Sequence, residues 1–351
     1  MFFKNNIIKA SLISIIITGL ILAFPVVISA GDYGFEDYLE AAEKGEEYPG
    51  LPGEGKVMGF ANVMEGEGFY TNVRESIIEQ AKLAGIDEDD LIIMNNDYDP
   101  DTAIRNADIM LSREPDGFIQ FQADADVNEM ISEDFGEASI PILAIDVPVP
   151  NAPFMGIDNW EVAQLAGEFA IKEIEDLWGG WDAVDLIVLL QNPAGGEVTM
   201  MRSEGFADAF IQEFGEDEAE ERIVRTDGGI GEAGEAREAM SDVLAANPAA
   251  NNIVVTTLND QMMQGAISAL EMMGYDPGND VIAASQGADD VGQTLIREGR
   301  INGSVAYFPE RYGEYAVPGM VALMEDKEVP DEIFVDNIVI TPENIDEYYP
   351  E

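Results

Sequence analysis

Several polar side chains stand where the strands of a predicted sheet end. Each lies at or just past the carboxyl end of a short apolar segment: Gln122, Asp146, Asn259 and Gln286. Open parallel sheets bind their ligands at this edge. Planar carboxylate and amide groups can make paired hydrogen bonds to neighbouring hydroxyl groups of one small molecule. The set therefore predicts a binding site for a polyhydroxylated ligand.

Aromatic side chains stand near comparable positions: Phe69, Tyr70, Trp160, Tyr307 and Phe308. A flat ring can stack on the C–H face of a sugar, so rings beside hydrogen-bonding groups are typical of a site for such a ligand. For any single residue a helix cap or a turn is an equally good interpretation, and Asn259-Asp260 is also an ordinary N-cap pair. The distribution of the set over both halves of the chain favours a site.

The composition excludes several classes of function. The chain has no cysteine and no histidine, so it has no disulfide, thiolate nucleophile, imidazole base or zinc site of the usual kind. Its 70 acidic and 17 basic residues give a net charge of −53, which argues against binding to nucleic acid or to anionic membranes. A dispersed acidic excess with few lysines favours a protein that works in high salt, where screening weakens self-repulsion. An ordinary acidic protein is the alternative.

The stretch from Ile140 to Trp160 interrupts the regular alternation of predicted strands and helices, which continues on both sides of it. Ile140–Ile145 is predicted to be a buried strand that ends at Asp146, and the prolines that follow leave no room for a crossover helix. Phe154–Ile157 is predicted to be a second short strand, and Asp158-Asn159 is a helix-start signal. We interpret this stretch as a ligand residue followed by the first crossing between two lobes.

Strands and helices alternate on both sides of this stretch. The first half has predicted strands at 57–63, 91–95 and 117–122 and helices at 69–84, 101–113 and 127–135. The second half has helices at 161–178, 200–214, 232–246, 260–273 and 291–298 and strands at 186–190, 223–226, 253–257, 281–285 and 304–307. A helix at 312–324 is assigned back to the first lobe, and a strand at 333–340, broken near Asp336-Asn337, closes the chain. The pattern predicts an α/β protein with two doubly wound parallel-sheet lobes.

The N-terminal segment has the pattern of an export signal over residues 1–30. Lys4 and Lys9 precede an almost wholly apolar run, and Ile28-Ser29-Ala30 resembles a cleavage site. The run approaches membrane-spanning length, so an uncleaved anchor remains open. Residues 31–55 are acidic and rich in glycine and proline, which predicts a solvated linker, with one helical turn around Tyr38 to Lys44 left open.

One motif suggests a metal site but departs from the required pattern. Asp97-x-Asp99-x-Asp101 is similar to the start of a calcium loop. Thr102 stands where the tight-turn glycine belongs, and Asp108 replaces the closing glutamate. We therefore expect a capped loop, with no metal and no cofactor.

Five motifs, in order along the chain, carry a resemblance to a known family: Gly68-Phe69-Tyr70, Ile140–Asp146, Gly156–Asn159, Arg202–Phe206 and Asn259–Ala266. From Lys56 to about Ile340 the chain resembles the ribose-binding protein family, the sugar-binding proteins of ABC importers. The resemblance implies a type I periplasmic binding protein fold with a three-segment hinge, crossing near Ile157, Tyr307 and Asp336. It implies an N-terminal lobe of 56–157 plus 308–336 and a C-terminal lobe of 158–307 plus 337–351.

The resemblance also implies roles for individual residues. Phe69 and Tyr70 match the family's stacking aromatics, Asp146 its sugar-binding carboxylate and Asn259 its second-lobe amide, while Gln122 stands where the family has an asparagine. Four positions depart from the family: Val147 and Met200 stand where arginines are usual, Gln286 replaces an aspartate and Tyr307 a glutamine. Losing two guanidinium groups removes directional hydrogen bonds, so we expect a less charged pocket than one for ribose.

The implied function is binding without catalysis. A small neutral ligand, a sugar or related polyol, would be captured by hinge closure and delivered to an ABC permease in the membrane. The protein is expected to be exported, periplasmic and monomeric, and to bind no nucleic acid. One alternative is a sensor that presents a signal ligand to a membrane receptor. Another is an exported carbohydrate-active enzyme with two carboxylates, although no second carboxylate is predicted at a neighbouring strand end.

Overall fold

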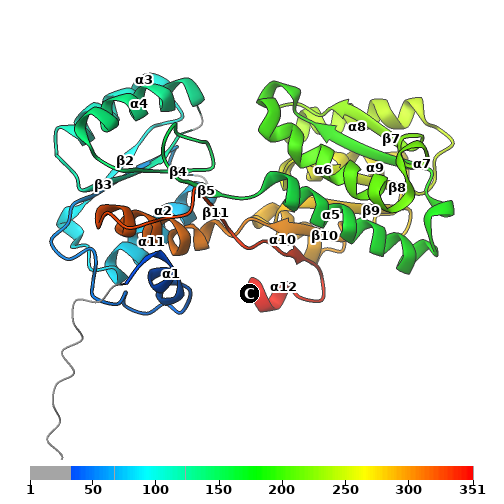
Figure 1. The fold of residues 1–351 in the computed structure, drawn as a ribbon. Coiled ribbons are helices and arrows are strands. Elements are labelled where there is room, and N and C mark those ends of the chain that lie inside the picture. Colours follow the sequence, from blue (N-terminus) through cyan, green and yellow to red (C-terminus); the bar gives the residue numbers. More distant parts are fainter. Residues whose placement is uncertain (1–32, 67, 123, 351) are drawn as a thin grey trace, which may run out of the picture. The chain divides into compact units, whose positions relative to one another are not determined.

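The computed structural model describes residues 33–66, 68–122 and 124–350 (Figure 1). The export signal predicted over residues 1–30 lies outside these ranges. Within them, no helix is long and apolar enough to cross a membrane.

The first lobe is built on a parallel six-stranded sheet of order β11-β5-β4-β3-β1-β2. Its strands are β1 (Met58–Asn62), β2 (Leu91–Asn95), β3 (Gly117–Phe121), β4 (Ile142–Ile145), β5 (Phe154–Gly156) and β11 (Glu332–Phe334). Every residue of β1, β3 and β4 is buried. Such continuous burial requires helices on both faces of the sheet.

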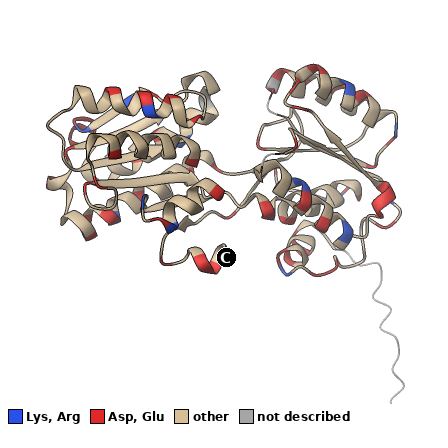
Figure 2. Ribbon diagram, turned by 180° about the vertical axis from the view of Figure 1, so that it is seen from behind, with Lys and Arg blue, Asp and Glu red and all other residues tan. Residues whose placement is uncertain are grey.

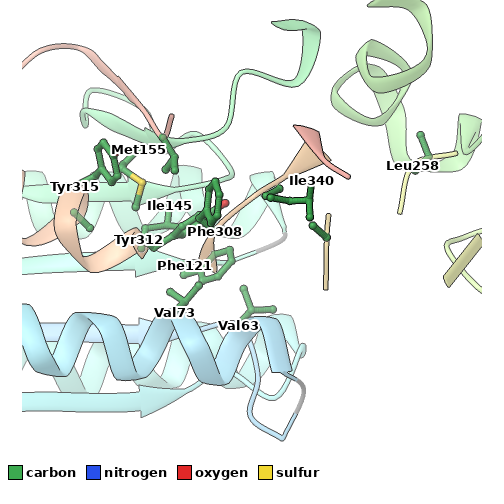
Figure 3. Packing of buried hydrophobic residues seen from close by; sticks show 14 of the residues in the cluster. Val63, Val73, Phe121, Ile145, Met155, Leu258, Phe308, Tyr312, Tyr315 and Ile340 are labelled. Atoms are coloured by element: carbon green, nitrogen blue, oxygen red, sulfur yellow. The ribbon is translucent and has the colours of Figure 1, made fainter. Parts of the chain in front are cut away.

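Alternate side chains of these strands pack against different helices. Phe60 and Ile119 belong to the cluster that contains α2 (Gly68–Leu83) and α11 (Tyr312–Met324). Ala61 and Phe118 belong to the cluster of α3 (Pro100–Leu111) and α4 (Ala125–Ala138) on the other face. Figure 3 shows Val73, Phe121 and Tyr312 in the first of these clusters. A 3₁₀ turn, η1 (Glu88–Asp90), precedes β2.

The segment predicted to be a solvated linker is part of this lobe wherever the structure describes it, so that prediction is wrong for residues 33–55. It forms α1 (Phe35–Glu43), which packs against α11. Tyr38 and Tyr48 are buried and stack with ring centroids 6.0 Å apart. The Tyr38 hydroxyl donates to Glu325 Oε2 (2.6 Å), and that of Tyr48 donates to Gln80 Oε1 (2.9 Å). The free energy gained by burying these rings is enough to hold the segment on the lobe, although most residues around them are polar.

The second lobe has a six-stranded sheet of order β12-β10-β9-β8-β6-β7. Its strands are β6 (Leu186–Gln191), β7 (Ile223–Asp227), β8 (Ile253–Thr257), β9 (Val281–Gly287), β10 (Gly303–Ala306) and β12 (Val339–Ile340). Only the edge strand β12 runs antiparallel to its neighbour among these described strands. The other strands are joined by helices, as parallel strands require.

Helices cover both faces of this sheet as well. One cluster joins Ile187 and Leu189 to α5 (Asn159–Glu173) and α6 (Gly196–Phe214). The opposite cluster joins Val188 and Leu190 to α8 (Ala233–Ala246), α9 (Asp260–Met273) and α10 (Asp290–Arg297). The remaining elements are a π-helical turn η2 (Ile174–Trp178), the 3₁₀ turns η3 (Trp181–Ala183), η4 (Pro193–Gly195) and η5 (Pro309–Arg311), and the short helices α7 (Glu216–Glu220) and α12 (Ile345–Tyr348).

Part of the acidic excess has a local structural role. Asp99, Asp124, Asp158 and Asp289 cap α3, α4, α5 and α10 through their side-chain oxygens. These acceptors satisfy N–H groups that have no partner within the helix. Asp99 also accepts from the Thr102 hydroxyl (2.7 Å), which agrees with a capped loop rather than a calcium loop. Figure 2 shows the other acidic residues spread over the helices of both lobes.

The chain passes between the two sheets three times. The crossings are residues 157–158 between β5 and α5, 307–311 between β10 and α11, and 335–338 between β11 and β12. These positions agree with the predicted hinge near Ile157, Tyr307 and Asp336. The prediction of two doubly wound parallel lobes joined by three segments is therefore confirmed.

Candidate binding site

Asp146 is fixed at the end of β4 by two neighbouring elements, β5 and α11. Its backbone has φ +57°, and its N–H donates to the Met155 carbonyl of β5 (2.9 Å). A Cβ atom at Gly156 would lie 2.7 Å from Asp146 Oδ1, so glycine is needed at that position. The Tyr312 hydroxyl, at the start of α11, donates to Oδ1 (3.1 Å). Oδ2 makes no hydrogen bond to a residue of the described ranges, so it can accept from a ligand.

The surroundings change the acidity of this carboxyl. Burial raises the pKa of Asp146 to about 6, against the opposite effects of the Arg202 guanidinium and the Tyr312 hydroxyl. Burial and the nearby Asp146 carboxylate also raise the pKa of Tyr312 well above its usual value. Above pH 6 the site therefore holds an ionised acceptor beside a protonated phenol.

Tyr312 connects this carboxyl group to three further aromatic rings, those of Phe69, Tyr70 and Phe121. The Phe69 ring meets the rings of Tyr70 (5.5 Å) and Tyr312 (5.6 Å) edge to face, and Tyr70 also contacts Phe121 (5.6 Å). Asn62 ties the first turn of α2 to β1 by donating to the Tyr70 carbonyl (3.0 Å). The predicted residues Phe69, Tyr70 and Asp146 are thus joined through Tyr312.

Gln122 lies at the same sheet edge. Phe121 pairs with Ile145 across β3 and β4, so Gln122 and Asp146 both stand one residue beyond that pair. The Gln122 side chain is buried, and its Oε1 accepts from the Asp124 N–H (3.4 Å). The structure therefore places Gln122 next to the strand end that carries Asp146.

In the second lobe, Gln286 and Tyr307 meet around Arg202. The Tyr307 hydroxyl donates to Gln286 Oε1 (3.3 Å), and Gln286 Nε2 donates to the Arg202 carbonyl (2.9 Å). The Arg202 guanidinium carbon lies 5.1 Å from the Tyr307 ring centroid, and Nε donates to Asn159 Oδ1 (2.6 Å). Burial raises the pKa of Tyr307 to about 12, although Arg202 acts to lower it.

The remaining predicted residues are not joined to these two groups. Asn259 caps α9, accepting from the Met262 N–H (2.9 Å) and donating to the Gly231 carbonyl (3.2 Å), as the alternative interpretation holds. Trp160 is 39% exposed in the first turn of α5, and Met200 lies on α6. Among the described residues, no hydrogen bond or ring contact links Trp160, Met200 or Asn259 to Asp146 or Arg202. Their roles in binding stay predictions.

Sequence reasoning missed Arg202, Asn159 and Tyr312 as site residues. Arg202 and Asn159 lie within the motifs that carry the resemblance, but no local pattern shows that Arg202 Nε donates to Asn159 Oδ1. The less charged pocket stays a prediction, although the Arg202 guanidinium acts to lower the pKa of Asp146. No local sequence pattern marked Tyr312 as a neighbour of Asp146, because the chain brings it to the first lobe only after the second crossing.

A second buried carboxyl group belongs to the interior of the second lobe. Asp260 is fully buried, accepts from the Ser304 hydroxyl (2.8 Å) and the Asp289 N–H (3.0 Å), and leaves no room for a Cβ at Gly292. Burial and the neighbouring Asp289 raise its pKa to about 7. Its packing suits a structural role. Within the described ranges, no group of three or more acidic residues is placed to hold a metal ion.

Two α/β lobes with largely parallel six-stranded sheets, joined by three crossings, have the fold of type I periplasmic binding proteins. The chain belongs to the family described as the periplasmic binding protein domain, whose model matches residues 58–328.

Individual relatives are distant. The galactofuranose-binding protein YtfQ of Escherichia coli is 25% identical over 213 residues, which are 58% of this chain and 63% of that protein. The chain thus matches less than two thirds of this relative's length. A periplasmic ribose ABC transporter structure from Conexibacter woesei has a TM-score of 0.74 at 19% identity, covering 85% of this chain and 96% of its own. An ABC transporter solute binding protein from Bacillus halodurans, with bound myo-inositol, has a TM-score of 0.66 at 22% identity, covering 84% and 98%. These structures share the fold.

Proposed function

We propose that this protein is a solute-binding protein that captures a small neutral polyol, a sugar in the first instance, and delivers it to an ABC importer. The observation that carries the proposal is the Asp146 site: a carboxyl group at a strand end, with one oxygen held by the Tyr312 hydroxyl, whose ring contacts that of Phe69. The names of the relatives support the ligand class, because they bind galactofuranose or myo-inositol.

The geometry suits recognition of hydroxyl groups. Asp146 Oδ2 accepts hydrogen bonds from ligand hydroxyls, and the amide of Gln122 can donate as well as accept. Phe69 and Tyr70 supply apolar ring surface for the C–H face of a sugar. A ligand that bridges the two lobes makes its full set of contacts only when the hinge closes, so it stabilises the closed state.

The proposal contains no catalytic step. Members of this family bind solutes, and the one other strongly shifted carboxyl in the described ranges, Asp260, has both oxygens engaged by Ser304 and Asp289. A paired-carboxylate mechanism needs a second carboxyl that faces the ligand. The Asp146 site therefore favours binding over hydrolysis.

We place this binding protein outside the cytoplasm, as a monomer in a saline environment. Residues 1–30 have the pattern of an export signal or an anchor, and the family's members are periplasmic. A net charge of −53 disfavours the compact state in dilute buffer and is screened in concentrated salt.

A thermal-shift screen over pentoses, hexoses, inositols and nucleosides tests the function. A ligand present at 100 times its dissociation constant adds about 2.7 kcal/mol to the free energy of unfolding. We expect at least one polyol to raise the melting temperature, and we expect calorimetry to show binding at one site. The absence of any shift across the panel, with folded protein, would overturn the proposal.

A further inference from the structure

The backbone at Asp146 has an uncommon conformation. Its φ is +57°, and the Val147 N–H donates to the Ile145 carbonyl across it (2.6 Å), so Asp146 is the central residue of a three-residue turn. With a positive φ at its centre, such a turn is rare and strained. A strained turn persists only where the surrounding structure holds it. The direction of the Asp146 side chain therefore depends on what holds the chain on both sides of this turn.

The sheet holds the chain before the turn. Ile145 pairs with Phe121 of β3 and with Met155 of β5, and the Asp146 N–H donates to the Met155 carbonyl (2.9 Å). After the turn, residues 147–153 lie outside the strands. This part of the chain needs a different support, because it has no place in the sheet ladder.

Helix α4 supplies that support through Asn128. Asn128 Nδ2 donates to the carbonyls of Val147 (3.4 Å) and Pro148 (3.3 Å), the first two residues after Asp146. Asn128 is fully buried, and the neighbouring Val149 packs into the cluster of α3 and α4. Since a buried amide or carbonyl group that loses its partner costs free energy, these contacts favour one position of the loop.

Gln120 of β3 fixes the orientation of the Asn128 amide. Gln120 is also buried, and its Nε2 donates to Asn128 Oδ1 (3.3 Å). Because the Asn128 oxygen accepts from Gln120, its NH₂ group faces the loop. A buried amide pair inside an apolar cluster specifies one arrangement of the elements that it joins. Here those elements are β3, α4 and the loop that follows Asp146.

We propose that Asn128 is a positioning residue of the binding site. From beneath the loop it holds the two carbonyls that follow Asp146, which keeps the strained turn in place and directs the carboxylate toward the ligand. Asn128 acts through Asp146 and makes no contact with the ligand itself. This inference rests on the proposed function and adds to it the part of the first lobe that orients the carboxylate.

The first test measures affinity by calorimetry at pH 8 for the tightest binder among D-ribose, D-galactose, D-allose and myo-inositol. Asn128→Leu keeps the volume but removes both donors, so binding should weaken by about fivefold or more. Asn106→Leu is the matched control, because Asn106 Nδ2 donates to the Asn95 carbonyl (2.8 Å) and to Asn96 Oδ1 (2.9 Å) at the end of β2 in the same lobe. The control should lose stability but keep its affinity within about twofold.

The second test is the pH profile of affinity, which a purely structural role would not move. Burial raises the pKa of Asp146 to about 6, and the charged or titratable groups that act on this carboxyl are the Arg202 guanidinium and the hydroxyls of Tyr312 and Tyr307. Asn128→Leu removes none of these groups. It frees the turn and admits water to the carboxyl, so the pKa falls toward its ordinary value. The pH below which affinity drops should therefore move down by about one unit, and it should stay in place in the control variant.

The outcomes separate the two proposals. If wild type binds none of these sugars and polyols, the proposed function fails and this inference fails with it. If wild type binds, and a folded Asn128→Leu protein has the same affinity and pH profile, only this inference is overturned. An equal loss of affinity in Asn106→Leu would overturn it as well, since the effect would then be general to the lobe. If Asn128→Leu does not fold, Gln120→Met decides: wild-type affinity with an unmoved pH profile would show that the amide pair does not orient Asp146.

Discussion

Replacing Asp146 by asparagine is the most direct test of the site. In the structure Oδ1 accepts from the Tyr312 hydroxyl, and Oδ2 has no hydrogen-bond partner among the described residues. An amide can keep its oxygen toward Tyr312 only by turning its NH₂ group toward the ligand. A ligand hydroxyl that donated to Oδ2 then faces an N–H group. The fold should be retained, because the size and the bond to Tyr312 are preserved.

The magnitude follows from one charged hydrogen bond and one mismatch. A hydrogen bond to a charged acceptor contributes about 1.5–3 kcal/mol, and the misplaced donor adds about 1 kcal/mol. We therefore expect a loss of about 2.5–4 kcal/mol in binding free energy at pH 8, or roughly 70- to 1000-fold in affinity.

The pH dependence gives a second signature. The pKa of Asp146 is raised to about 6, so the carboxyl is ionised at pH 8 and mostly protonated at pH 5. Wild-type affinity should be level above about pH 7 and fall by up to about tenfold for each pH unit below 6. The Asp146→Asn protein lacks this titration, so its affinity should vary far less.

Calorimetry at pH 8 and pH 5 with the best ligand of the panel measures both effects. Asp134→Asn is a matched control, because Asp134 is an exposed residue of α4 in the same lobe. A loss below about threefold at pH 8, with normal melting, would show that Asp146 does not bind the ligand and would refute the reasoning.

Four further predictions concern stability and the aromatic residues. The melting temperature should be higher in 2 M salt than in dilute buffer, because salt screens the charge of −53. Tyr70→Ala should weaken ligand binding by about 1 kcal/mol or more in calorimetry, through lost ring contact. Tyr38→Ala should lower the free energy of unfolding in urea by about 3 kcal/mol, because a buried ring and its bond to Glu325 are removed. Since the pKa of Asp260 is raised to about 7 in the folded protein, its contribution to stability is full below about pH 4 and is lost as the pH rises through 7. Asp260→Asn should therefore flatten the dependence of unfolding free energy on pH between 4 and 8.

Each of these four predictions has an outcome that would contradict it, and Tyr98→Ala is the control for the two tyrosine substitutions. Tyr98 is 59% exposed, so Tyr98→Ala should change neither affinity nor stability appreciably. An equal or lower melting temperature in salt would contradict the saline interpretation. A Tyr38→Ala protein as stable as the Tyr98→Ala protein would mean that α1 does not support the lobe. An unchanged pH profile in the Asp260 variant would mean that this carboxyl titrates alike in the folded and unfolded chain.

The sequence allowed most of the fold to be predicted because its periodic signals are local. The strands β2 and β8 and the helices α9 and α11 begin and end where the apolar patterns predict. By contrast, α1 was foreseen only as a single helical turn around Tyr38 to Lys44, and its burial was missed, because Phe35, Tyr38 and Tyr48 stand among acidic and glycine residues. Their burial depends on α2 and on α11, and the bond from Tyr38 to Glu325 spans 287 residues. No local pattern shows that such a partner exists.

The sequence predicted which candidate site residues stand at strand ends, but it did not predict which other side chains contact them. Asp146, Gln122 and the rings of α2 follow from where strands and helices begin and end. Arg202 and Tyr312 do not, because their approach depends on how a helix is rotated and on where the chain returns after the second crossing. Asn259 shows the opposite error, since one polar residue at a helix start fits a cap as well as a ligand contact.

The three crossings also determine the order in which the lobes can complete their folding. Apart from the edge strand β12, the second sheet comes from one continuous stretch, Leu186 to Ala306. The first sheet needs α11 to cover Phe60, Ile119 and Leu143, and it needs β11 beside β5, both of which follow the whole second lobe. The bond from the Gly313 N–H to the Ser76 hydroxyl closes a loop of 237 residues, and such distant contacts form slowly. During synthesis, which starts at the N-terminus, the face of the first sheet that α11 covers therefore stays partly exposed until about the last 40 residues are available. A chain with such an exposed apolar face is prone to aggregation. Apart from the edge strand β12, the lobe whose strands are made first is therefore the lobe that is completed last.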